Sequence, residues 1–191
     1  LLANKDFIND NQVLVLDPWA AAGPITRGVG KDGRNWIFRL SVDDSKAGEV
    51  IAKQACDVEN YMRPALLLED TGWGKSNLRT MRQALAKRGL APVKEIFFDW
   101  NIKELGAKQM LADISSSNAD VLFFVGNAPE GKTFIRAMAA HDRKDRIPIV
   151  SHWGITGGAF FESLGSSLLT KEVDLKFIQT RFSFLDPGCF S

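Results

Sequence analysis

The sequence predicts an α/β fold in which a mainly parallel sheet lies between two layers of helices, giving three α-β-α layers. Short apolar runs alternate with amphipathic helical stretches four times between Ala65 and Val150. Most of these runs are apolar at almost every position, which is typical of strands buried on both faces. Alternating strands and helices form a parallel sheet through right-handed crossovers, so the alternation predicts the class of fold.

The composition excludes several classes of protein. The chain has 191 residues, of which 45% are hydrophobic and 25% charged, as in ordinary globular domains. A net charge of +1 argues against a nucleic-acid surface, and no apolar run approaches the roughly 18 residues that a spanning helix needs. The chain begins at Leu1 without a signal-peptide pattern. We therefore expect it to be part of a longer protein. We also expect Cys56 to be a buried free thiol, because free cysteine behaves as a small hydrophobic residue.

In the first third of the chain, we expect a helix over 2–9, followed by two strands joined by a turn-rich loop. The first strand, 13–16, is a compact apolar run of the kind buried on both faces. The second strand covers 36–40. Asp43 or Asp44 can then cap a helix with an apolar side.

The middle of the chain predicts two strand–helix units. A buried strand over 65–68 leads through the turn 71–74 into a helix from Ser76, its N-cap, to about Arg88. The next strand, 93–98, starts after a proline and carries two charged residues, which places it at an edge of the sheet. A helix over 104–115 follows.

The last part of the chain continues the same alternation. We expect three further strands, each short, with a loop and two helices between them. In order, these are a strand over 121–125, a loop over 126–132, a helix to about 140, a strand over 147–150, a helix over 159–164 and a strand over 173–180.

The loop after the 121–125 strand matches a phosphate-binding motif. Gly126, Gly131, Lys132 and Thr133 of GNAPEGKT (126–133) fit G-x-x-x-x-G-K-[ST] between a strand and a helix. A P-loop nucleotide-binding enzyme is therefore one hypothesis. Against it, the strand downstream carries no Asp for the metal, and the proline and glutamate within the loop suit a phosphate poorly.

A second hypothesis is a binding cleft without catalysis. Ligands of open parallel sheets bind beyond the carboxyl ends of the strands, and there the sequence places tryptophans and small or polar residues. A tryptophan there can equally anchor its loop on the core, and a lone histidine is more often structural than a ligand contact. No metal-ligand spacing or catalytic triad stands out, so we expect no metal, no cofactor and no catalysis. The candidate ligand-binding residues are Trp19, Ala20, Ala21, Trp73, Asn127, His152 and Trp153.

Five segments, in order, resemble one known family. They are DPWAA (17–21), NWIFR (35–39), ALLLEDTGWGK (65–75), ADVLFFVG (119–126) with Pro129-Glu130, and IPI (147–149). Together they are similar to the type I periplasmic solute-binding proteins of ABC transporters, specifically the branched-chain amino acid receptor group of extracellular ligand-binding receptors. The similarity spans roughly residues 13–184.

The resemblance implies a flavodoxin- or Rossmann-like lobe of a two-lobed protein. Such proteins bind small solutes between lobes that close by a hinge, then present them to a membrane permease. Residues 1–42 would be the end of the first lobe with a hinge crossover, 43–165 the second lobe, and 166–191 the return crossover and tail. The location would be periplasmic or otherwise extracytoplasmic, with or without a lipid anchor. A ligand-binding sensory domain of a membrane receptor stays as an alternative.

The resemblance also assigns roles to single residues. Trp19 and Ala21 would line the first-lobe side, and Trp73 would close over the ligand. The family often has a hydroxyl at Ala21 and an aromatic at Asn127, and its ammonium-holding acidic residue has no clear counterpart here. These departures favour an amino-acid-like ligand other than a plain aliphatic one, or an aromatic acid or amide.

One expectation concerns association. A buried-type strand left at an open edge is prone to pair with another chain. We therefore expect the segment 2–16 to pack on a second copy or to be displaced onto its own lobe.

Overall fold

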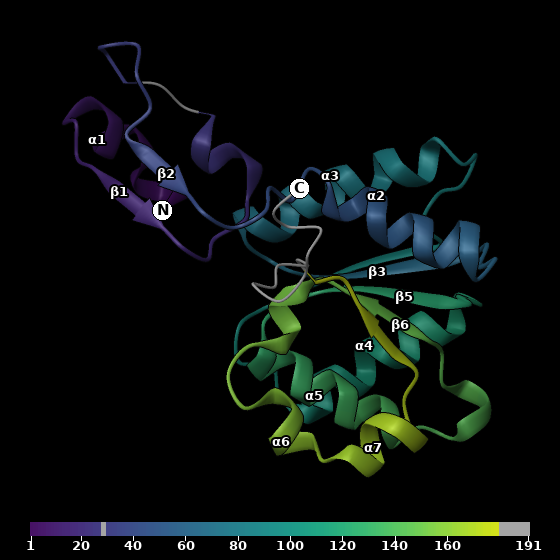
Figure 1. The fold of residues 1–191 in the computed structure, drawn as a ribbon. Helices are drawn as coiled ribbons and strands as arrows, with labels where there is room; N and C mark the ends of the chain where they lie inside the picture. The colour runs from purple at the N-terminus through teal and green to yellow at the C-terminus, as the bar shows by residue number, and fades with distance from the viewer. Residues whose placement is uncertain (28–29, 180–191) are drawn as a thin grey trace, which may run out of the picture.

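The structure is a computed structural model that describes residues 1–27 and 30–179. It confirms the predicted α/β class: a five-stranded parallel sheet, in the order β4-β3-β5-β6-β7, lies between two layers of helices (Figure 1). The strands are β3 (Pro64–Glu69), β4 (Lys94–Phe98), β5 (Val121–Val125), β6 (Ile149–Ser151) and β7 (Leu175–Phe177). The sheet edge at β4 is the position predicted for that strand.

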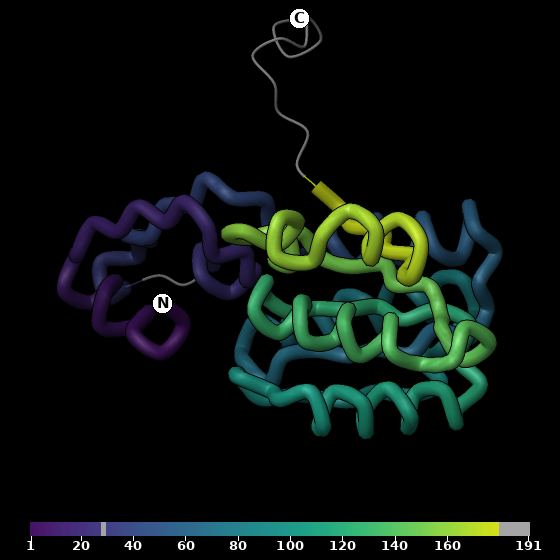
Figure 2. Tube along the Cα trace, turned by 90° about the horizontal axis from the view of Figure 1, so that it is seen from below, coloured from purple at the N-terminus to yellow at the C-terminus, as the bar shows by residue number. Residues whose placement is uncertain are grey.

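Helices cover the two faces of this sheet unequally. On one face lie α2 (Ala47–Ala52), continued by a π-helix over Lys53–Val58, and α3 (Gly72–Ala86). On the other lie α4 (Glu104–Ser116), α5 (Ala128–Ala139), α6 (Phe160–Leu164) and α7 (Ser166–Lys171) (Figures 1 and 2). None of the helices within 1–27 and 30–179 has the length and apolarity to span a membrane.

The alternation of side chains along β3 explains the two-sided core. Leu66 and Leu68 pack with α2 and α3, whereas Ala65 and Leu67 pack with α4 and α5. Successive strand residues point to opposite faces, so an unbroken apolar run fits a strand covered on both sides. Cys56 lies in the first of these core layers as a buried free thiol, as predicted.

A smaller unit lies to one side of this sheet, at the carboxyl ends of its strands (Figures 1 and 2). Here β1 (Val15–Asp17) pairs in parallel with β2 (Ile37–Arg39), next to α1 (Lys5–Asp10). Ile37 and Ile8 form a small core on one face of the pair.

The prediction that strand 13–16 is buried on both faces is wrong. Leu16 is 71% exposed and Leu14 is exposed beside it. Within the described part of the chain, β1 pairs only with β2, and no helix covers the outer face of the pair. An apolar sequence predicts burial only where other elements cover the strand, and the described residues cover only one face of this one.

Three predicted helix starts are also wrong. α3 begins at Gly72 instead of after Ser76, because the Thr71 hydroxyl accepts a hydrogen bond from Gly74 N at 3.2 Å and caps the helix earlier. α5 begins at Ala128 inside the predicted loop 126–132, since Pro129 suits the first turn of a helix. Neither Asp43 nor Asp44 caps α2; Asp44 is used elsewhere.

The remaining predicted elements are close to the observed ones. The helix 159–164 is α6, while α7 was not predicted. The final strand is shorter than the expected 173–180, covering Leu175–Phe177. Residue 180 and the tail that follows it lie outside the described residues.

The first turn of α3 requires glycine at position 74. A Cβ on Gly74 would lie 1.9 Å from the carbonyl oxygen of Glu69. We expect Gly74→Ala to lower the free energy of unfolding by roughly 2–3 kcal/mol, the upper range for overpacking, as measured by urea denaturation. Gly157→Ala is the matched control, because its Cβ would have no neighbour closer than 3.7 Å. Equal stability of the two variants would contradict this geometry.

Candidate functional site

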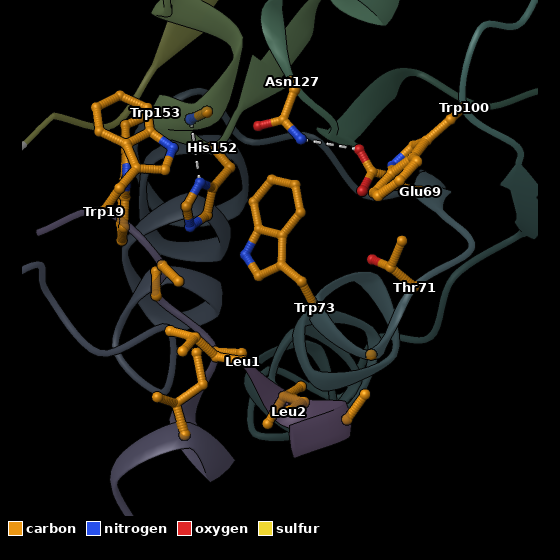
Figure 3. Close-up of a pocket in the computed structure, with 17 residues that line it drawn as sticks. Leu1, Leu2, Trp19, Glu69, Thr71, Trp73, Trp100, Asn127, His152 and Trp153 are labelled. Carbon is orange, nitrogen blue, oxygen red and sulfur yellow. Dashed lines mark hydrogen bonds between the residues drawn. The ribbon is translucent and has the colours of Figure 1, made fainter. Parts of the chain in front are cut away.

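A cavity of about 480 Å³ opens between the carboxyl ends of β3, β5 and β6 and the loop that follows β1 (Figure 3). Its wall comes from segments far apart in the sequence, because parallel strands bring all their carboxyl ends to one edge. All seven residues predicted for the site line this one cavity: Trp19, Ala20, Ala21, Trp73, Asn127, His152 and Trp153.

Indole rings dominate the wall. Trp19, Trp73, Trp100 and Trp153 line the cavity from four different segments. The fifth tryptophan, Trp36, lies outside it and donates from Nε1 to Asp32 at 3.0 Å. Tryptophan combines a large apolar area with one donor, so the wall suits a flat or apolar ligand of small size.

Trp73 occupies the centre of this wall. Its ring meets the His152 ring edge-on, with centroids 5.0 Å apart. Its Nε1 is buried and has no hydrogen-bond partner among the described residues. Such an orphaned donor costs about 1–3 kcal/mol, which a core position would rarely carry.

His152 is held by its own side-chain contacts and is fully buried. Its Nδ1 accepts from Gly154 N at 3.2 Å, and its Nε2 lies 2.6 Å from Asp44 Oδ1. One nitrogen accepting and the other donating describes the neutral Nε2–H tautomer. Because both nitrogens are occupied and the ring is buried against Trp73 and Trp153, His152 supports the indole wall and offers a ligand no hydrogen bond.

Asp44 is the partner that ties the two units together. Its buried carboxylate also accepts from Asn77 Nδ2 of α3 at 2.9 Å, and its backbone N donates to Ala21 O at 3.0 Å. One residue thereby joins α3, the end of β6 and the loop after β1. This contact sets where Ala21 and its neighbours stand against the five-stranded sheet.

The loop after β1 has its own support. The Asp17 carboxylate accepts from Trp19 N at 3.1 Å and from Ala20 N at 2.9 Å. Arg39 donates to Ala21 O at 2.9 Å and pairs with Asp43 at 3.0 Å. Burial would raise the pKa of Asp43, but hydrogen bonds from Ser45 and Arg39 hold it below its ordinary value.

Glu69 and Asn127 form the polar part of the cavity. Glu69 ends β3 and is only 2% exposed. Its Oε2 accepts from Asn127 Nδ2 at 3.0 Å (Figure 3). Asn127 occupies the N-cap position of α5 without a side-chain capping bond, so its amide is free to cross to the neighbouring strand.

The GNAPEGKT stretch does not form a phosphate cradle. Only Gly126 and Asn127 connect β5 to α5, and Lys132 and Thr133 lie within the helix. Glu130 is buried and accepts from Asn101 N at 3.0 Å. A phosphate loop needs a run of free backbone amides, which a two-residue turn lacks. The nucleotide hypothesis is therefore not supported.

The sequence analysis missed several lining residues. Glu69 and Trp100 each lie within two residues of the carboxyl end of a strand. The strand-end argument could have found both. Thr71, Leu1 and Leu2 also line the cavity. Across the described residues, no three His, Cys, Asp or Glu side chains group closely enough to hold a metal ion.

Comparisons with known proteins agree with the fold. A family model described as "Periplasmic binding protein" matches residues 1–166. A solute-binding protein of an ABC transporter from R. palustris, solved with 4-hydroxybenzoate, superposes with a TM-score of 0.71 at 18% identity, covering 84% of this chain and 42% of that one. A leucine binding protein from Thermotoga maritima gives a TM-score of 0.64 at 19% identity, covering 78% and 40%.

A third structure, an amino acid ABC transporter substrate-binding protein from Pseudomonas fluorescens, gives a TM-score of 0.66 at 20% identity, covering 88% of this chain and 43% of that one. Such low identities show the fold alone. The chain spans less than half the length of these structures. A comparison with curated proteins finds no match.

Removing the Asp44 carboxylate tests the tie between the units. We expect Asp44→Ala to lower the free energy of unfolding by roughly 2–4 kcal/mol. It leaves His152 Nε2 without an acceptor and removes one of the two acceptors of Asn77 Nδ2, which keeps Trp73 O; each lost buried hydrogen bond costs about 1–3 kcal/mol. Asp44→Asn keeps one oxygen acceptor and should lose less. The exposed Asp142→Ala is the control. Urea denaturation measures all three, and an Asp44→Ala variant as stable as the control would contradict the assignment.

Proposed function

This chain belongs to the periplasmic binding protein family, and from this premise we propose that it is part of the solute-binding component of an ABC-type transporter. It binds a small amino-acid-like or aromatic-acid ligand in the cavity at the strand ends. The family binds solutes and is non-catalytic, so the cavity residues hold the ligand and do not transform it.

The observation that carries the proposal is the convergence of the site. Seven residues, chosen from four separate loops by a strand-end argument, line one cavity. The indole wall supports a ligand with a flat apolar body. Two structural neighbours, one solved with 4-hydroxybenzoate and one named a leucine binding protein, are consistent with small carboxylated solutes.

The two units correspond, in this proposal, to parts of the two lobes of the full protein. We assign residues 1–42 to the end of the first lobe and a hinge crossover, 43–165 to the second lobe, and 166–191 to the return crossover and tail, of which 180–191 lie outside the described residues. Asp44 then lies directly after the proposed hinge crossover. Lobes that close over a ligand would move about such a point.

The partner and location follow from the same proposal. The closed, loaded protein would dock on a membrane permease that takes over the solute. This places the full protein in the periplasm or otherwise outside the cytoplasm, either free or held by a lipid anchor.

Ligand binding can be tested by thermal shift. The melting temperature should rise with aromatic amino acids or benzoates, because a ligand that binds only the folded state stabilises it by RT ln(1 + [L]/Kd). Trp73→Ala should abolish the ligand-induced rise, whereas Trp36→Ala, outside the cavity, should keep it. ATP with Mg²⁺ should give no rise. A rise with ATP–Mg²⁺ that Lys132→Ala removes would instead establish the nucleotide hypothesis.

The open face of the β1–β2 pair supports a proposal of self-association. Leu16 and Phe38 are register partners, and Leu14 and Leu40 lie two residues away on the same face. All four are exposed, Leu40 by 86%. Contiguous exposed apolar patches mark sites of association. We propose that this face packs on a second copy of the chain.

Light scattering tests this pairing. The chain should show concentration-dependent dimers, and a Leu16→Glu, Phe38→Glu double variant should be monomeric. Val58→Glu, an exposed apolar position on the π-helix, is the control and should still dimerise. A wild-type chain that stays monomeric at every concentration would contradict the proposal.

A further inference from the structure

The cavity contains one buried acid with an unfilled acceptor. Glu69 is 2% exposed, and within the described residues its carboxyl group receives a single hydrogen bond, from Asn127 to Oε2. Oε1 has no donor there. Unlike Trp73 Nε1, Oε1 is not among the unpaired polar atoms that are sealed from solvent. It therefore faces the cavity that Glu69 lines.

No protein cation balances this acid. Glu69 takes part in no salt bridge within residues 1–27 and 30–179, and the described cavity wall contains neither Lys nor Arg side chains. The nearby Asp70 differs, since Lys75 pairs with it at 2.8 Å on the surface. Burying an unpaired carboxylate costs free energy unless a partner arrives, so the missing partner is best supplied by the ligand.

The rest of the wall suits the same partner. Indole faces attract cations through their π-electrons, most strongly among the aromatic side chains. Trp100 and Trp73 line the same cavity as Glu69. An anionic ligand would meet a carboxyl group and indoles here, and among the described lining residues it would find no Lys or Arg side chain. The positive group of this wall is the α-amino group of Leu1, which forms no salt bridge with Glu69 within the described residues.

We propose that Glu69 is the counter-ion of the solute, and that the ligand carries a protonated amine next to an aromatic or flat apolar body. A primary ammonium supplies the N–H donors that Oε1 lacks, in a charge-assisted hydrogen bond. This inference rests on the proposed function, because it names the chemical class of solute for the same cavity. It narrows the ligand from aromatic acids in general to those solutes that bear an amine.

Three probes of similar shape test the charge preference: 2-phenylethylamine, the neutral 2-phenylethanol and the anion 3-phenylpropanoate. Ligand-observed NMR titration of this chain should give the amine the lowest Kd, by about tenfold over the alcohol, equivalent to about 1.4 kcal/mol. The acid should bind more weakly than the alcohol.

Two variants locate the effect. Glu69→Gln keeps an oxygen for Asn127 Nδ2 but removes the charge, so the amine should lose its advantage while 2-phenylethanol binds as before. Retained binding of the alcohol shows that the cavity of the variant is intact. Asp70→Asn removes the adjacent surface charge, which lies outside the cavity, and should leave the order of the three probes unchanged.

The outcomes separate the two proposals. If 3-phenylpropanoate binds as well as or better than the amine, or if Glu69→Gln leaves the preference intact, the cavity binds solutes but the role of Glu69 is wrong. If Asp70→Asn removes the preference for the amine, long-range attraction by surface charge explains that preference, and the proposed role of Glu69 is again wrong. If none of the three probes binds, the proposed function fails together with the inference.

Discussion

The buried carboxylate of Asp44 is the contact on which the arrangement of this molecule depends. It accepts from His152 at the end of β6 and from Asn77 in α3, while its own backbone N–H binds Ala21. A buried charge is tolerated only when its hydrogen bonds are made, so the Asp44 carboxylate stays buried only while these contacts are kept. The loop after β1 is thereby held against the carboxyl ends of the sheet, and a cavity forms between them.

The polar groups around the cavity divide into those already used and those still available. His152 is committed through both ring nitrogens, and Oδ1 of Asp17 is committed to the loop after β1. Glu69 keeps an unfilled acceptor. Buried polar groups in native proteins are nearly always paired, so an unfilled acceptor that faces a cavity is a candidate for a ligand contact. This distinction separates His152, a scaffold residue that touches the cavity, from Glu69, for which we propose a role in recognition.

Much of this could be predicted from the sequence, and the failures have physical causes. Uninterrupted apolar runs identified β3 and β5, and the strand-end rule found all seven expected wall residues. The burial of strand 13–16 could not be predicted, because exposure depends on what covers the strand. The starts of α3 and α5 were missed because Thr71 and Pro129 act through local geometry that resembles a loop. The Asp44–His152 contact joins residues 108 positions apart, and no local pattern reports it.

The central claim is that the strand ends form one solute-binding wall, and the indole N–H signals of the five tryptophans test it directly. Four of them line the cavity, whereas Trp36 is bound to Asp32 outside it. In a ¹⁵N-resolved NMR titration with an aromatic amino acid, signals of Trp19, Trp73, Trp100 and Trp153 should shift together with one dissociation constant, while Trp36 stays in place. Shifts at Trp36 equal to the others, or a titration in which none of the four moves, would contradict the account.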